Sequence, residues 1–154
     1  MAEALSEHAT RLRLVGAAVV ASLAVYSVVV LLVPASPSLS GAQGSTLLGV
    51  LVLVAALNLV TLKPVYRAML TGPLRVFAAG RSTGPLLAAH LLATVVAMGR
   101  VEAVAVLGLF LDLVTGQRDW FWGFTGVAAL GMLGIWPSPQ RVRDDLGLDG
   151  TVEP

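Results

Sequence analysis

Two charged residues, Arg100 and Glu102, lie near the middle of a long apolar stretch that covers residues 86–116. A charge deep in a bilayer costs about 2.5–3.5 kcal/mol on insertion scales, so such residues usually pair inside the protein or carry ions and protons. On a helix with 100° per residue, the two side chains are about 160° apart and cannot pair with each other. Each therefore needs a partner from another helix or must reach water, and Arg100 can extend toward the cytoplasmic side to do so. Candidate partners are Asn58, Tyr26 and Ser22.

Glu102 is the candidate site for ion binding or reversible protonation. Further polar side chains follow one side of the same expected helix, with Thr94 and Asp112 at one angle and His90 close to it. Strings of His, Asp and Glu in membrane segments are typical of proton relays. His90 and Asp112 also lie near the ends of this helix, where water lowers the cost of a polar group. A purely structural origin of the stripe therefore stays open.

The composition indicates an integral membrane protein. Of 154 residues, 56% are hydrophobic and only 12% are charged, which does not describe a soluble domain. Four apolar runs predict an all-α transmembrane four-helix bundle, because about 20 helical residues cross the hydrocarbon core. The expected helices cover residues 12–33, 46–62, 86–115 and 121–136, between a polar tail at 1–11 and a disordered tail at 137–154.

The longest connection, residues 63–85, is basic and contains no acidic residue. Apolar side chains between its charges predict short amphipathic helices in the membrane interface, with the basic groups toward lipid headgroups. A solvated loop that only fixes topology is the alternative. The excess of basic residues places this connection and both termini in the cytoplasm. The candidate headgroup ligands are Lys63, Arg67, Arg75 and Arg81.

Several classes of function lack the residues they need. The sequence has no cysteine, no His-Glu-x-x-His motif, no glycine-rich phosphate loop and no Gly-x-Ser-x-Gly nucleophile elbow. We therefore expect no enzyme activity, no metal site and no cofactor. The basic residues form no stripe with aromatic side chains, so nucleic acid is not an expected partner. The expected partners are the lipid bilayer and either a second copy of the chain or another membrane protein.

Residues 102–109, Glu-Ala-Val-Ala-Val-Leu-Gly-Leu, resemble the carboxylate-bearing helix of the rotary ATPase proteolipid, subunit c. This resemblance implies an ion-binding carboxylate at Glu102 and a packing glycine at Gly108. The layout of the whole chain resembles uncharacterised small bacterial four-helix membrane proteins. That likeness rests on Tyr26, on the Glu-Ala…Gly-Leu helix, and on Pro137 followed by Arg141. It implies the bacterial inner membrane as the location and carries no activity with it.

Two interpretations of function therefore stay open. In the first, the protein is a structural or assembly component in which buried Arg100 and Glu102 mediate contacts between helices or with a partner. In the second, it translocates protons or cations, with Glu102 as the protonatable site. The substitution Glu102→Gln distinguishes them, because an amide can still accept a hydrogen bond but cannot take up a proton at neutral pH.

Overall fold

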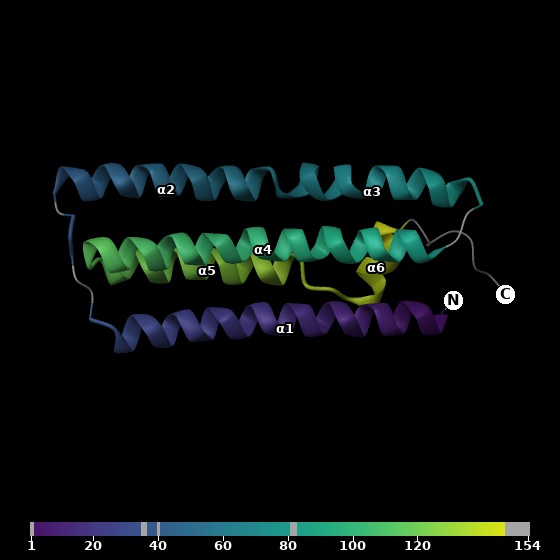
Figure 1. Ribbon diagram of the computed structural model, residues 1–154, viewed down its shortest axis with the longest axis horizontal. Helices are drawn as coiled ribbons and strands as arrows, with labels where there is room; N and C mark the ends of the chain where they lie inside the picture. Colours follow the sequence, from purple (N-terminus) through teal and green to yellow (C-terminus); the bar gives the residue numbers. More distant parts are fainter. Residues whose placement is uncertain (1, 35–36, 40, 81–82, 147–154) are drawn as a thin grey trace.

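A computed structural model describes residues 2–34, 37–39, 41–80 and 83–146, and these ranges form helices joined by short connections (Figure 1). The all-α prediction is confirmed, since no strand occurs in these ranges. The helices are α1 (Ala2–Leu32), α2 (Ala42–Val60), α3 (Leu62–Ala78), α4 (Thr83–Thr115), α5 (Arg118–Gly134) and α6 (Pro139–Asp145).

Helix α4 is the centre of the bundle. It contacts α1, α2, α3 and α5, and in Figure 1 it runs between α1 on one side and α2 with α3 on the other. Small and branched apolar residues allow this close approach, and Ala93, Val101, Val104 and Ala105 are at most 1% exposed. The helix that carries Arg100 and Glu102 is therefore the one that four other helices share.

Three helical segments are long and apolar enough to cross a membrane: Ser6–Leu32, Ala42–Ala78 and Gly84–Thr115. They overlap the first three expected spans and are what an integral membrane protein requires. The fourth expected span corresponds to α5, which has 17 residues. That length is at the lower end of the roughly 17–25 residues with which helices cross the hydrocarbon core.

The basic connection at 63–85 differs from the expectation of short helices lying in the interface. Leu62–Ala78 forms one helix, α3, which continues the line of α2 and packs along α4 (Figure 1). Only Thr61 separates the two helices, and its N–H and C=O both join helical hydrogen bonds. The apolar side of α3 is occupied by the bundle, because Leu74 and Phe77 pack against a buried cluster. This side is therefore not available to lie on a membrane surface.

Both expected tails contain ordered helix. The expected tail at 1–11 belongs to α1 from residue 2 onward, and α6 packs against α1. Val142 and Leu146 belong to a buried cluster with Leu12. Helix α6 has only seven residues, too few to show a repeat of apolar residues at helical spacing. The sequence therefore predicted disorder here. Residues 147–154 lie outside the described residues.

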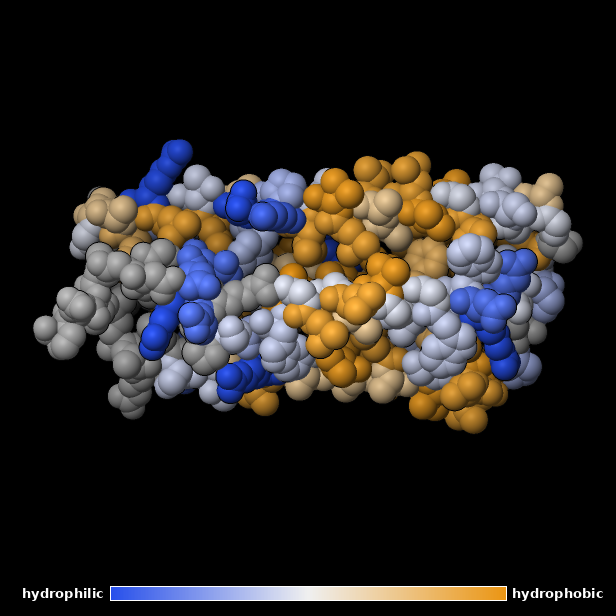
Figure 2. All heavy atoms as spheres, turned by 180° about the vertical axis from the view of Figure 1, so that it is seen from behind, coloured by the Kyte–Doolittle hydropathy of each residue, from blue (hydrophilic) through white to orange (hydrophobic). Residues whose placement is uncertain are grey.

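Polar and apolar surfaces separate along the long axis. The start of α1, the end of α3 and α6 lie at one end of the molecule (Figure 1). Hydrophilic side chains gather chiefly over this end, and hydrophobic ones cover the middle (Figure 2). Large exposed apolar side chains are frequent on the helices of the body, such as Leu31, Leu53, Val60, Leu130 and Leu133. A lipid-facing body with a polar end follows from this distribution.

Candidate functional site

Glu102 faces α1. Its Oε1 accepts a hydrogen bond from Ser22 Oγ at 2.5 Å and one from Tyr26 OH at 2.8 Å. Ser22 and Tyr26 are four residues apart and lie on the same face of α1, so both hydroxyls reach one carboxylate. Within the described residues, no basic group lies within 4.0 Å of Glu102. Two of the three expected partners therefore bind this carboxylate, which is held by hydroxyls alone.

Arg100 faces the opposite side, toward the junction of α2 and α3. Its Nε donates to Asn58 Oδ1 at 3.2 Å, and Nη2 donates to Thr61 Oγ1 at 2.5 Å. Nη1 donates to the backbone oxygen of Thr61 at 3.4 Å. The flat fork of guanidinium donors suits several acceptors in one plane. The third expected partner, Asn58, thus binds Arg100, and the two charges of α4 each tie a different helix to it.

A second polar cluster joins four helices near the polar end of the bundle. His90 of α4 uses both ring nitrogens: Nδ1 lies 3.0 Å from His8 Nε2 of α1, and Nε2 lies 3.1 Å from Tyr66 OH of α3. Tyr66 OH donates to Asp145 Oδ2 of α6 at 2.8 Å. His90 Nε2 is 3.6 Å from the same carboxylate oxygen. We call His8, Tyr66, His90 and Asp145 the histidine cluster.

The hydrogen bonds of the histidine cluster have a consistent direction. Tyr66 gives its single proton to Asp145, so its oxygen can accept one from His90 Nε2. His90 Nδ1 is then the acceptor for the Nε2 proton of His8. His8 and His90 are buried, with 7% and 2% of their surface exposed, and these bonds supply hydrogen-bond partners to their ring nitrogens. The cluster therefore links the first and last described helices, α1 and α6, through α3 and α4.

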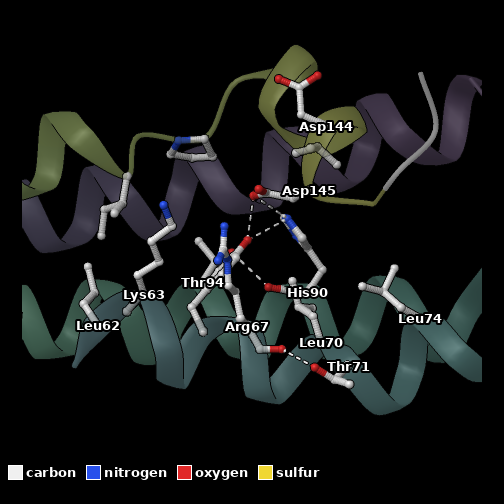
Figure 3. A pocket seen from close by; sticks show the side chains of 15 residues that line it. Leu62, Lys63, Arg67, Leu70, Thr71, Leu74, His90, Thr94, Asp144 and Asp145 are labelled. Carbon is white, nitrogen blue, oxygen red and sulfur yellow. Dashed lines mark hydrogen bonds and ion pairs between the residues drawn. The ribbon is translucent and has the colours of Figure 1, made fainter. Parts of the chain in front are cut away.

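A cavity of about 780 Å³ lies beside the histidine cluster (Figure 3). Lys63 and Arg67 extend from α3 toward α6, and His90 and Asp145 meet at its centre. Cavities of roughly 300–1,000 Å³ are typical of small-molecule sites. The remaining lining combines polar and apolar residues: Leu62, Tyr66, Leu70, Thr71, Leu74, Thr94, Ala97, Ile135, Pro137, Val142 and Asp144.

The polar stripe predicted along α4 is divided into two ends. Thr94 lines the cavity, is 5% exposed, and donates its hydroxyl proton to the backbone oxygen of His90. Asp112, at the other end, is fully buried. Neither of its carboxylate oxygens has a hydrogen-bond partner in the part of the chain that the structure describes. A buried carboxyl group without a hydrogen-bond partner lowers the stability of the fold, so its presence requires an explanation.

Helix α5 closes the stripe between these ends. A Cβ atom added to Gly108 of α4 would lie 2.6 Å from Phe124 Cβ, and one added to Gly131 of α5 would lie 3.1 Å from Val101. Both pairs are in apolar contact across the α4–α5 interface. These contacts are apolar at the levels of Gly108 and Gly131, so they do not favour an ion path there.

The four basic candidates have different surroundings. Lys63 and Arg67 line the cavity, while Arg75 is exposed on α3 away from it. Arg81 lies outside the described residues. The sequence interpretation placed His8 in a solvated tail and did not single out Tyr66 or Asp145 as site residues. The sequence did contain one indication for His8: the chain has only two histidines, and His90 was already a candidate.

Comparison with protein families, with curated proteins and with solved structures finds no match to this chain. Within the described ranges, no three His, Cys, Asp or Glu side chains meet in a way that could hold a metal ion. Function is therefore inferred from the polar contacts, the cavity and the distribution of charge.

Proposed function

We propose that the chain is a multi-pass protein of the bacterial inner membrane, with both termini in the cytoplasm and a structural or assembly role without enzyme activity. The observation that carries this proposal is the pairing of Arg100 and Glu102 with neutral groups of two other helices. Lipid tails are as apolar as the helices, so helix association in a bilayer depends on close packing and polar contacts. The two residues thus fix the register of α1 and α2 on α4.

Aromatic residues support a membrane boundary part of the way along α4. Trp120 and Trp122 lie at the start of α5, and Trp136 follows its end, as in the aromatic belts of membrane proteins. At 1.5 Å per residue α5 extends for about 26 Å, close to the hydrocarbon thickness of about 30 Å. The Trp136 ring and Met98 both border Gly16, so we place the cytoplasmic boundary at the level of Met98.

This boundary makes the charges of α4 less costly than their position in the sequence suggests. Arg100 follows Met98 by two residues, or about 3 Å along the helix, and Glu102 by about 6 Å. An arginine at this depth reaches the interface readily. The histidine cluster and the basic residues of α3 then belong to a cytoplasmic extension of the bundle.

Proton or cation translocation at Glu102 is the second candidate function. The supporting observation is that the carboxyl group binds the hydroxyls of Ser22 and Tyr26. No basic side chain lies within 4.0 Å of it in the described structure. Hydroxyl groups can donate to a carboxylate or accept from a carboxylic acid, so the site tolerates both protonation states. The close α4–α5 contact lies on the Thr94–Asp112 face of α4 and does not favour a path along that face.

The variants Glu102→Gln and Glu102→Ala test the two functions on purified protein. A structural role predicts that the Gln variant unfolds in detergent close to the wild type, because its amide oxygen still accepts a hydrogen bond. The Ala variant should lose about 1–3 kcal/mol, because Tyr26 OH loses its acceptor and Ser22 Oγ keeps only the backbone oxygen of Val19. In liposomes, a potential-driven proton flux present in the wild type and absent in the stable Gln variant would instead establish translocation. Loss of stability in both variants to the same extent would contradict the hydrogen-bonding role.

A further inference from the structure

Two cations of the cavity have no acidic partner among the residues that the structure describes. Lys63 and Arg67 are four residues apart on α3, so they lie on the same face of the helix. Neither forms an ion pair within 4.0 Å in the described part of the chain, although acidic residues occur on the opposite wall. Figure 3 shows both side chains extending from α3 into one space. Two adjacent cations beside a cavity favour an anionic group such as a phosphate.

The wall next to these cations is apolar. Leu62, Leu70 and Leu74 on α3, together with Ile135 after α5, line the cavity. Inorganic phosphate would gain nothing from these side chains, whereas the hydrocarbon part of an amphiphile would be buried by them. The cavity therefore combines two charges for a headgroup with an apolar surface for a chain.

The level of the cavity along the bundle matches that of lipid headgroups. Lys63 follows Thr61 by two residues, and Thr61 binds Arg100 close to the boundary placed at Met98. Lys63 and Arg67 thus lie on the cytoplasmic side of the hydrocarbon core, within about one to two helical turns of it. Phosphates of the inner leaflet lie in this region, which attracts basic side chains.

We propose that this cavity binds one anionic phospholipid from the cytoplasmic leaflet. The lipid phosphate lies between Lys63 and Arg67, and an acyl chain runs along the apolar wall toward the bilayer. This role goes beyond the general attraction of basic residues to a membrane surface, because it assigns the binding to two residues and a bounded volume.

Purified, delipidated protein in a maltoside detergent tests the proposal by titration with fluorescent phosphatidylglycerol. Phosphatidylcholine of the same chain length tests for charge, and sodium phosphate and glycerol phosphate test for a free anion. The variant Lys63→Ala/Arg67→Ala removes the two cavity charges. The control Arg13→Ala/Arg75→Ala removes two exposed charges that do not line the cavity. Ile135→Trp fills the apolar part without changing charge.

We expect phosphatidylglycerol to bind more tightly than phosphatidylcholine, and the soluble phosphates not to compete. The cavity variant should lose about thirtyfold in affinity, from the usual contribution of a basic residue near anionic lipid, and the control should stay within about threefold. Ile135→Trp should also weaken binding, with an unchanged melting temperature as evidence of intact folding. Equal losses in the cavity variant and the control would reduce the effect to surface electrostatics. Displacement of the lipid by glycerol phosphate would show that the ligand of the cavity is a soluble anion and not a lipid. Equal binding of phosphatidylglycerol and phosphatidylcholine would overturn the proposal.

Discussion

A methyl group added at Gly108 tests the packing that separates the two ends of the α4 stripe. The added Cβ of Gly108→Ala would meet Phe124 Cβ at 2.6 Å and the backbone Cα of Phe121 at 3.3 Å. Neither atom is the end of a flexible side chain, so relief requires the α5 backbone to move away from α4. On the same helix, Gly99 has no atom within 4 Å of the position a Cβ would take. Gly99→Ala is therefore the matched control.

The two substitutions are expected to change stability in opposite directions. Replacing glycine by alanine inside a helix stabilises by roughly 0.5–1 kcal/mol, and Gly99→Ala should show this gain alone. Gly108→Ala has the same gain in helix propensity, but it also overpacks a tight interface. Overpacking destabilises a protein by about 1–3 kcal/mol. We expect Gly108→Ala to be less stable than Gly99→Ala by about 1–3 kcal/mol, because the propensity gain is common to both variants.

Reversible unfolding in mixed detergent and dodecyl sulfate micelles, followed by tryptophan fluorescence, measures this difference. A Gly108→Ala protein as stable as Gly99→Ala would mean that α5 does not press on α4 at this level. The stripe between Thr94 and Asp112 would then be open enough for water, and the ion-path interpretation would gain support. A selective loss at Gly108 would support the closed interface and the structural role.

Three further experiments test the remaining polar groups. A double-mutant cycle of Arg100→Ala and Asn58→Ala should give a coupling free energy of about 0.5–3 kcal/mol in the same unfolding assay, and additive effects would argue against the contact. Asp112→Asn should raise the free energy of unfolding by roughly 1 kcal/mol, because it replaces a buried carboxyl group that has no hydrogen-bond partner among the described residues by a neutral amide; a clear loss would show that the carboxyl group has a stabilising partner. Tyr66→Phe should loosen α6, so limited trypsin cleavage after Arg143 should become about fivefold faster, whereas an unchanged rate would exclude the histidine cluster as its anchor.

The sequence by itself determined the class of structure and part of the pairing. Long apolar runs specify helices that can enter a bilayer, because their backbone polar groups must be satisfied within each segment. Polar side chains are scarce in such runs, so the few that exist are expected to meet. This is why Ser22, Tyr26 and Asn58 could be named in advance as candidate partners of two charges on another helix. The angle between Arg100 and Glu102 also predicted that they would face different neighbours.

Only the tertiary structure decided what forms the polar end of the bundle. The contact between His8 and His90 joins residues 82 positions apart, and it depends on how α1 docks on α4. Asp145 reaches the same cluster through a seven-residue helix, too short for its buried face to be read as a periodic pattern. Helix α3 looked like an interfacial segment because its amphipathic pattern is the same whether the apolar side meets lipid or protein. In the structure the apolar side of α3 meets protein, because α3 packs along α4 and Leu74 and Phe77 contact the buried cluster that includes Val142. The cavity lies beside the histidine cluster.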